Sequence, residues 1–414
     1  MNMKYLITGC LLICISLVCV FLHFHASDVE IEKPSWKTYT LEEEATSRFI
    51  DLAYDSENNP IIIYYAENAG GGVKAFYSEN TIKDYIFSDR EWKQENFSGN
   101  GPLGFFLSAD IDEKDVVHLS FMNYDIGNDI LYYYNSSSRK QVAVDSITQS
   151  GIGAGMHSSI VFVKGEGPYI FYHVEQGRRF MLSKPGADPI LLETGSGLNT
   201  DAAVIGNMIY VAHRGRDDMK LRLSTYNTET GDWETKIREE TASTIAVSTF
   251  KERPYAIFFN YLDKGIYFSF FDDEPKKIAN GHESRISTDA NENAIYVSFN
   301  RQGEGLFLLN TTDASVFYEQ IFISGRRAGV FNSLKVTQKG DLKVAYLEDE
   351  ALKYLEYEVS SYLYHSKQRE IKKRAYLGLF FVFLAISAFL LYAALLKNRL
   401  KKKDLKSPKR GKTL

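Results

Sequence analysis

The chain has 414 residues, a hydrophobic content of 44% and a formal net charge of −5. This length is sufficient to bury a large core, and the mild negative charge argues against general nucleic-acid binding. The three cysteines, Cys10, Cys14 and Cys19, all lie in the first apolar segment. The remainder of the chain is therefore expected to hold neither a disulfide nor a cysteine-bound metal.

Two apolar segments flank the central part of the chain, at residues 5–24 and 375–396. Both are long enough to cross a bilayer, and nine Lys or Arg follow the second segment, which predicts a cytoplasmic C-terminus at a cell membrane. The first segment is predicted to be an uncleaved signal anchor, with a cleaved signal peptide as the alternative. The predicted layout is a cytoplasmic N-terminus (1–4), the anchor (5–24), an extracytoplasmic domain (25–359), a linker (360–374), a transmembrane helix (375–396) and a basic cytoplasmic tail (397–414).

The central part contains seven copies of one repeat, each made of three short runs that alternate apolar and polar residues between turns rich in Gly, Asn and Asp. The copies begin at Phe49, Phe106, Ile160, Ala202, Ile245, Arg285 and Ser333. Alternation with a period of two indicates strands, and units too small to bury their own faces are typical of propellers. The sequence predicts an all-β, seven-bladed β-propeller, with six or eight blades as the alternative.

The tryptophans indicate the fourth strand of a blade. Trp92 and Trp233 each open a short run after the third strand of a copy, whereas no such run follows Tyr357 in the last copy. We therefore expect residues 36–41, which begin with Trp36, to be the outer strand of the last blade and to close the ring. Both membrane connections would then leave from one face, called the bottom, and the top face would point away from the membrane.

Arginines and histidines gather in the loops predicted for the top face. Arginine recognises carboxylates and phosphates bidentately, so such a cluster would suit an anionic ligand, for example an acidic glycan, or a partner protein. The alternative is an ordinary set of loop residues, partly neutralised by Asp217, Asp218 and Glu304. The candidate ligand-binding residues are Arg178, Arg179, Arg214, Arg216, Arg285, Arg301, Arg326, His173 and His213.

The common motifs of hydrolases and metal sites are absent from the sequence. There is no HExxH, no GxSxG and no set of His or Cys at metal-ligand spacing, so neither a metal nor a cofactor is predicted. Asp110, Asp112 and Asp115 imitate the start of a calcium loop, but the Gly and Glu expected further along that loop are missing. These aspartates are expected to end a strand and begin its turn.

The repeat resembles the sialidase-like (BNR) propeller superfamily over residues 36–359. The resemblance lies in an apolar strand, a D-x-x-x-x-P or D-x-N-x-N turn, a strand ending in Tyr or Phe, a Gly turn and a Tyr-rich third strand. Active members carry Asp boxes and an arginine triad with a Tyr nucleophile. Here no Asp box is intact, since STDANENA (287–294) and TETGDW (228–233) only approach the motif. No three arginines align with the triad, so no catalytic residue is assigned.

These features predict a membrane-anchored, extracytoplasmic binding module without enzymatic activity, which recognises a ligand such as an acidic glycan, or a partner protein, with its top face. One alternative is a glycan hydrolase of the sialidase type. The other is a scaffold subunit of a membrane or envelope complex.

Overall fold

The computed structural model describes two units, Trp36–Tyr357 and a second one formed by the residues on either side of it. The predicted anchor at 5–24, the three cysteines, Arg326 and residues 400–414 lie outside the described residues. The described residues are 36–45, 49–66, 71–79, 91–97, 103–124, 129–324, 327–357, and 374–399 without 376, 383, 391, 394 and 398.

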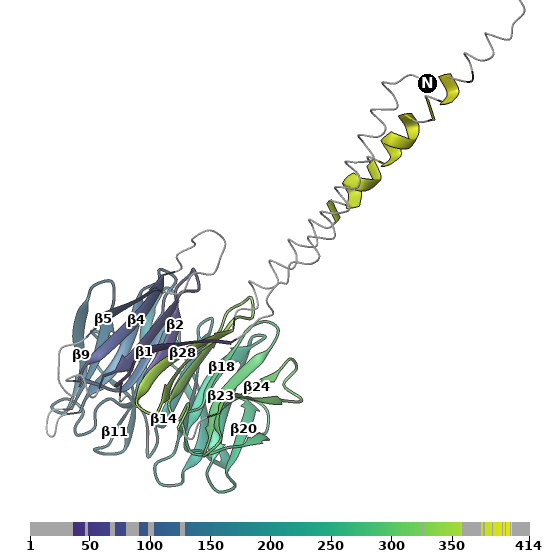
Figure 1. Ribbon diagram of the computed structural model, residues 1–414. Coiled ribbons are helices and arrows are strands. Elements are labelled where there is room, and N and C mark those ends of the chain that lie inside the picture. The colour runs from purple at the N-terminus through teal and green to yellow at the C-terminus, as the bar shows by residue number, and fades with distance from the viewer. Residues whose placement is uncertain are drawn as a thin grey trace, which may run out of the picture. The chain divides into compact units, whose positions relative to one another are not determined.

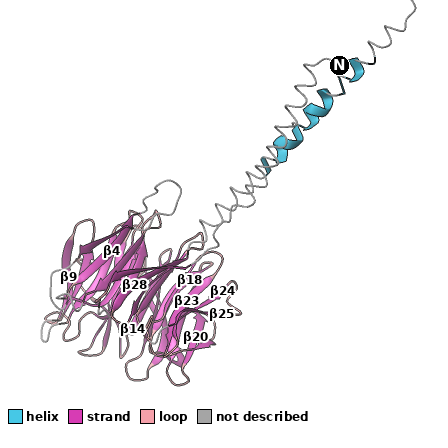
Figure 2. Cartoon of the chain, viewed as in Figure 1, coloured by secondary structure: helices cyan, strands magenta, loops and turns pink. Residues whose placement is uncertain are grey.

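The first unit is a propeller of seven four-stranded antiparallel sheets, which confirms the predicted fold and the number of blades (Figures 1 and 2). Blade 1 contains β2 (Ile50–Tyr54), β3 (Pro60–Tyr65), β4 (Val73–Glu79) and β5 (Glu91–Asn96). Blade 2 contains β6 (Leu103–Ile111), β7 (Val117–Asn123), β8 (Ile130–Asn135) and β9 (Lys140–Ser146). Blade 3 contains β10 (Met156–Val163), β11 (Gly167–Val174), β12 (Arg179–Ser183) and β13 (Ile190–Thr194). Blade 4 contains β14 (Leu198–Ile205), β15 (Met208–Arg214), β16 (Lys220–Asn227) and β17 (Trp233–Thr241), and blade 5 contains β18 (Ile245–Phe250), β19 (Arg253–Asn260), β20 (Gly265–Phe270) and β21 (Lys276–Asn280). Blade 6 contains β22 (Ser287–Ala290), β23 (Ile295–Arg301), β24 (Gly305–Thr311) and β25 (Tyr318–Ser324). Blade 7 contains β26 (Asn332–Val336), β27 (Leu342–Glu348), β28 (Ala351–Tyr357) and β1 (Trp36–Glu42).

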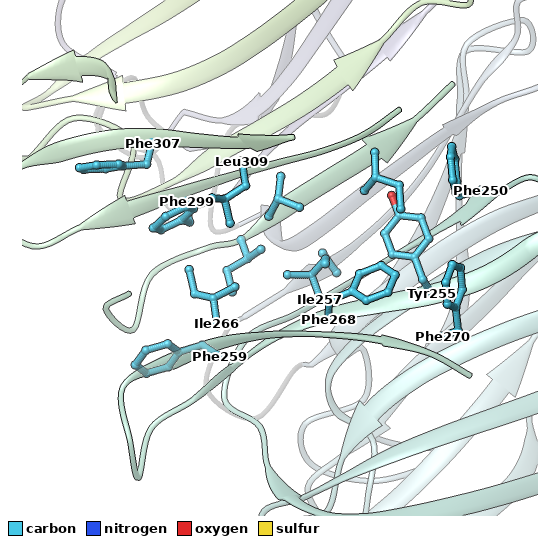
Figure 3. Packing of buried hydrophobic residues seen from close by; sticks show 14 residues of the cluster. Phe250, Tyr255, Ile257, Phe259, Ile266, Phe268, Phe270, Phe299, Phe307 and Leu309 are labelled. Carbon is cyan, nitrogen blue, oxygen red and sulfur yellow. The ribbon is translucent and has the colours of Figure 1, made fainter. Parts of the chain in front are cut away.

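Strand composition follows position within the blade. The second strands are buried on both faces and are correspondingly apolar, as in β3 (PIIIYY) and β19 (RPYAIFFN). The outer strand β5 (EWKQEN) is exposed except at Trp92 and Glu95, which are half-buried. Apolar side chains from adjacent blades form the layers between sheets, and Figure 3 shows the layer between blades 5 and 6, which includes Tyr255, Phe268 and Phe299.

Blade 7 contains strands from both ends of the propeller. β1 pairs antiparallel with β28, and Trp36 lies opposite Tyr357 with their rings 4.8 Å apart. Tyr357 also pairs with Leu342, which in turn pairs with Val336 at the end of β26. The chain therefore enters and leaves the propeller at the same end of this blade, the end opposite Phe331.

The first strands of the blades, β2, β6, β10, β14, β18, β22 and β26, lie side by side around the ring. Each has a free edge, because it pairs with only one strand of its own blade. Unpaired backbone groups of a buried edge need other partners. Here short polar side chains of the first strands act as these partners. Each first strand contributes two positions, two residues apart, and around the ring these positions form an upper and a lower row. The upper row is Asp51, Ser108, Ser159, Asp201, Ala246, Ser287 and Ser333, and the lower row is Ala53, Asp110, Val161, Ala203, Ser248, Asp289 and Lys335.

These rows connect every neighbouring pair of blades. The carboxylate of Asp201, for example, accepts the backbone N–H of Val247 from the next blade at 2.7 Å. At the blade 7 to blade 1 junction, the Ser333 hydroxyl donates to Asp51 at 3.0 Å. The other connections are Asp51 to Ala109 N, Ser108 to Ile160 N, Asp110 to Phe162 N, Ser159 to Asp201, Ser248 to Asp289, Ser287 to Leu334 N and Asp289 to Val336 N.

The second unit contains a helix at Leu377–Lys397, whose 21 residues are long and apolar enough to cross a membrane. At about 1.5 Å per residue it would span roughly the 30 Å of a hydrocarbon core. Its range nearly coincides with the predicted segment at 375–396. The helix is therefore a candidate membrane anchor.

Candidate functional site

A cavity of about 580 Å³ is lined by residues from all seven first strands or from the positions just before them. Its size lies in the range of about 300–1,000 Å³ that is usual for small-molecule sites. Because the first strands form the innermost ring, the cavity follows the centre of the propeller. The upper and lower rows contribute Asp51, Asp110, Asp201 and Lys335 to its wall.

One residue from each blade lines the Phe331 end of this cavity, here called the mouth, two positions before the upper row. The seven residues, here called the mouth residues, are Phe49, Phe106, His157, Asn199, Thr244, Arg285 and Phe331. In blade 7 the order along the chain is Phe331, then Ser333 and Lys335, so the mouth is at the end opposite Val336. Sequence analysis anticipated only Arg285 among them.

Three consecutive mouth residues have an unusual backbone conformation. Phe106, His157 and Asn199 have φ angles of 51°, 54° and 50°, in the left-handed region that side chains other than glycine seldom adopt. All three lie inside strands, at places where the register between the first and second strands shifts. The other non-glycine residues with positive φ in the described ranges lie in turns or bends.

Hydrogen bonds from neighbouring side chains hold two of these bulges. The Ser158 hydroxyl donates to the Phe106 carbonyl at 2.6 Å, and the Thr200 hydroxyl donates to the Gly197 carbonyl at 2.9 Å. A β-bulge redirects the side chain that it carries, and backbone strain of this kind is concentrated at functional sites. Glycine would carry no such strain at these positions, so the strain at Phe106 and His157 is associated with the side chains that they present.

The mouth has an aromatic half and a polar half. The ring of Phe106 lies 5.2 Å from that of Phe49 and 4.6 Å from that of His157. Behind them Phe105 packs against Phe49 and against Tyr65. Across the mouth, blades 4 to 6 present Asn199, Thr244 and Arg285, with Glu283 beside them.

The ring of His157 is uncharged under ordinary conditions. Burial, followed by repulsion from His173 and Arg214, lowers the pKa of His157 to about 3. Protonation is therefore confined to pH values well below 5. At neutral pH the imidazole can offer a ring face, one donor and one acceptor.

Carboxylates outnumber cations in the cavity wall. Among the residues that the structure describes, four carboxylates, Asp51, Asp110, Asp201 and Glu283, line it together with two cations, Arg285 and Lys335. Burial raises the pKa of Asp201 to about 6, against the opposing effect of hydrogen bonds from Val247 and Ala202. Burial also raises the pKa of Asp110.

Lys335 is the cation at the level of the lower row. Burial opposes its charge, but attraction to Asp289, Asp51, Asp110 and Asp201 raises the pKa of Lys335. It therefore remains protonated across the physiological range. Lys335 compensates the carboxylates that connect the blades, so the lower part of the cavity is an ionic structure common to several blades.

Of the residues predicted from sequence, Arg178, Arg216 and His173 come together at the junction of blades 3 and 4. Arg178 pairs with Asp217 at 2.7 Å, and Arg216 pairs with Glu175 at 2.7 Å. The buried His173 ring contacts the same Glu175 at 3.1 Å and the Ser196 carbonyl at 2.8 Å. These contacts link the two blades and occupy the charged groups.

The remaining predicted residues are dispersed. Arg179 donates to the Ser150 carbonyl, and the fully buried His213 donates to or accepts from the Ser224 hydroxyl at 2.9 Å. Arg301 pairs with Glu319 at 2.6 Å and Glu304 at 3.6 Å, over the ring of Phe307. Arg214 is half-buried near Glu283, and burial lowers its pKa. Arg326 is beyond the described residues.

Sequence analysis missed the polar rows because it treated short polar residues as strand ends. Asp112 does cap a turn, since it accepts the N–H groups of Lys114 and Val116, as expected. Asp110 instead lies in β6 and lines the cavity. The missed signal is the recurrence of Asp or Ser at the same position of several repeats. No group of His, Cys, Asp or Glu in the described ranges could hold a metal ion.

Thr244 and Thr288 both line the cavity, and they provide a matched test of its polar groups. The Thr244 hydroxyl has no hydrogen-bond partner among the described residues, whereas that of Thr288 contacts the Tyr255 hydroxyl at 3.0 Å and the Tyr296 carbonyl at 2.8 Å. Thr288→Val is expected to lower the free energy of unfolding by about 1–2 kcal/mol. Thr244→Val is expected to leave it unchanged or raise it. Urea unfolding followed by tryptophan fluorescence measures both, and equal losses would contradict the assignment.

No protein-family model matches the chain, and no curated protein matches it in sequence. Among solved structures, the BP39L lectin from Burkholderia pseudomallei is 11% identical with a TM-score of 0.58, over 77% of this chain and 97% of the lectin. The NanB sialidase from Streptococcus pneumoniae is 11% identical with a TM-score of 0.44, over 80% of this chain and 71% of the sialidase. The SapL1 lectin, solved with alpha methyl fucoside, is 11% identical with a TM-score of 0.45, over 68% of this chain and 98% of the lectin. Such identities show the fold alone, and the match to the BP39L lectin is in agreement with the predicted β-propeller fold.

Proposed function

We propose that this protein is a membrane-tethered binding module that holds a glycan ring at the mouth of its central cavity and does not catalyse a reaction. The observation that carries the proposal is the left-handed conformation of Phe106, His157 and Asn199 at that mouth. An aromatic wall suits the C–H face of a sugar ring, and the amide of Asn199 and the charged groups of Arg285 and Glu283 suit its hydroxyls. Among the residues of the predicted set that the structure describes, only Arg285 lines this site.

The tether would be the helix at Leu377–Lys397, with the C-terminus in the cytoplasm and the propeller on the extracytoplasmic side of a cell membrane. The basic residues after this helix support the orientation. Trp36 and Tyr357 are paired at the end of blade 7 opposite Phe331. Both connections to the membrane would therefore leave from the bottom of the propeller, and the mouth would face away from the bilayer.

The test is binding of the full chain in detergent to a glycan array, compared with its Phe106→Gly variant. Glycine removes the ring and also relieves a positive φ, so the variant is expected to fold and to lose at least tenfold in apparent affinity. Asp349→Gly is the matched control, because Asp349 is an exposed turn residue with φ 55°. Failure to bind any glycan would overturn the proposed function. Turnover of chromogenic glycosides would show that the protein is a hydrolase and not only a binding module.

A further inference from the structure

We infer that the sugar ring taken by the cavity is uncharged or carries an amine, and that acidic sugars are excluded. The inference rests on the proposed function, because it concerns the ligand of the same mouth. It differs from the anionic ligand expected from the loop arginines. Three observations carry it: the charges of the wall, the partners of the arginines and the form of the mouth.

The wall carries more carboxylates than cations, as described above. The lower-row cation, Lys335, is attracted to Asp51, Asp110, Asp201 and Asp289, so its charge is already balanced. A carboxylate on the ligand would lose its hydration in a space whose described charged groups sum to a negative charge. A hydroxyl or an ammonium group meets no such penalty there.

Of the predicted arginines that the structure describes, all except Arg285 lie outside the cavity lining. Arg178 and Arg216 pair with Asp217 and Glu175 at 2.7 Å each. Arg301 is bound by Glu319 and Glu304. None of these three arginines lines the cavity. Arg285 does line it, as does Glu283 two residues earlier, and Glu283 also attracts Arg214, which is outside the lining.

The form of the mouth indicates a ring rather than a linear ligand. Phe49, Phe106 and His157 form a continuous aromatic wall, with successive ring centroids 5.2 and 4.6 Å apart. The His157 ring is neutral, since burial lowers its pKa to about 3, and it supplies no positive charge for an acidic sugar. An uncharged ring face against this wall gains apolar contact without breaking an ion pair.

The test uses sets of methyl pyranosides in which one group changes at a time. In each of the gluco, galacto and manno series, the neutral glycoside is compared with its 2-amino and its uronic acid counterpart. Saturation-transfer NMR with the full chain in detergent at pH 7 measures each affinity. For the series that binds, we expect the uronic acid to bind at least tenfold more weakly than the neutral and amino rings. This difference in affinity should become smaller at high salt, because screening weakens the repulsion between the uronic acid and the carboxylates of the wall.

Two variants separate the possible results. Phe106→Gly is expected to abolish binding of every ring, while Asp349→Gly leaves it unchanged. Glu283→Gln is expected to reduce the ratio of the neutral-ring affinity to the acidic-ring affinity by roughly threefold, since one repelling charge is removed. A uronic acid that binds as tightly as the neutral ring, and is lost in Phe106→Gly, would overturn the inference and leave the binding function standing. If no ring of any series binds, the proposed function itself is wrong.

Discussion

Replacing Lys335 with methionine is expected to lower the free energy of unfolding by about 3 kcal/mol at pH 7.5, because removing one partner of a buried ionic group leaves the others uncompensated. Asp289, Asp51, Asp110 and Asp201 all attract this ammonium group. These carboxylates also join neighbouring blades through their hydrogen bonds. Their mutual repulsion would therefore act directly on the junctions of the ring.

The deficit is also expected to depend on pH. Burial raises the pKa of Asp201 to about 6 and raises that of Asp110. A group with a raised pKa in the folded state stabilises the fold fully below its unfolded pKa, and this contribution is lost as the pH rises through the folded pKa. Without Lys335 these pKa values rise further, so the deficit of the variant should grow between about pH 4 and 7. Lys335 itself stays protonated throughout that window, because its own pKa is raised, so the pH dependence comes from the carboxylates.

Urea unfolding of the full chain in detergent, followed by tryptophan fluorescence at pH 4.5 and 7.5, measures this difference. Lys339→Met is the matched control, because Lys339 is exposed and only four residues away. Its effect is expected to stay within about 0.5 kcal/mol. A deficit of Lys335→Met that is small, or that is the same at both pH values, would show that the lower row is not an ionic unit.

Most of the propeller could be predicted because its first three strands per blade carry strong patterns. Runs such as IIIYY in β3 and AIFF in β19 are buried on both faces, and they repeat seven times. The outer strands were harder, since β5, β13 and β21 are short and largely exposed. A half-solvated edge strand needs few apolar residues, so only the tryptophans at 36, 92 and 233 marked such strands in the sequence.

The site was harder to predict for a different reason. Arginine was expected to mark the ligand because it binds anions, yet Arg178, Arg216 and Arg301 form ion pairs with acidic residues on nearby loops and strands. Which charges remain unbalanced depends on pairs formed between distant residues, such as Arg178 with Asp217. The cavity itself arises from residues two positions apart in seven separate strands. These positions are recognised as equivalent only when the seven repeats are superimposed, because no pattern within a single repeat marks them.

The close approach of blade 4 to blade 3 depends on Gly197, and Gly197→Ala is expected to lower the free energy of unfolding by about 3 kcal/mol. Gly197 has a φ of 91°, and a Cβ atom there would overlap the ring of Phe180. Phe180 is fully buried and its ring lies 4.4 Å from that of His213, so it has no space into which to move. The extra methyl group must therefore shift the backbone that leads into β14.

Gly186→Ala separates the steric part of this effect from the conformational part. Gly186 has a similar φ of 81°, but nothing lies within 4 Å of the position of its Cβ atom, so it should show only the left-handed penalty of about 1 kcal/mol. Urea unfolding of both variants gives the difference. Because Gly197 also accepts the Thr200 hydroxyl beside Asn199, we expect Gly197→Ala to weaken glycan binding as well, while Gly186→Ala leaves it intact. Equal unfolding free energies for the two variants would mean that the blades adjust to the methyl group, and that this junction does not fix the geometry of the mouth.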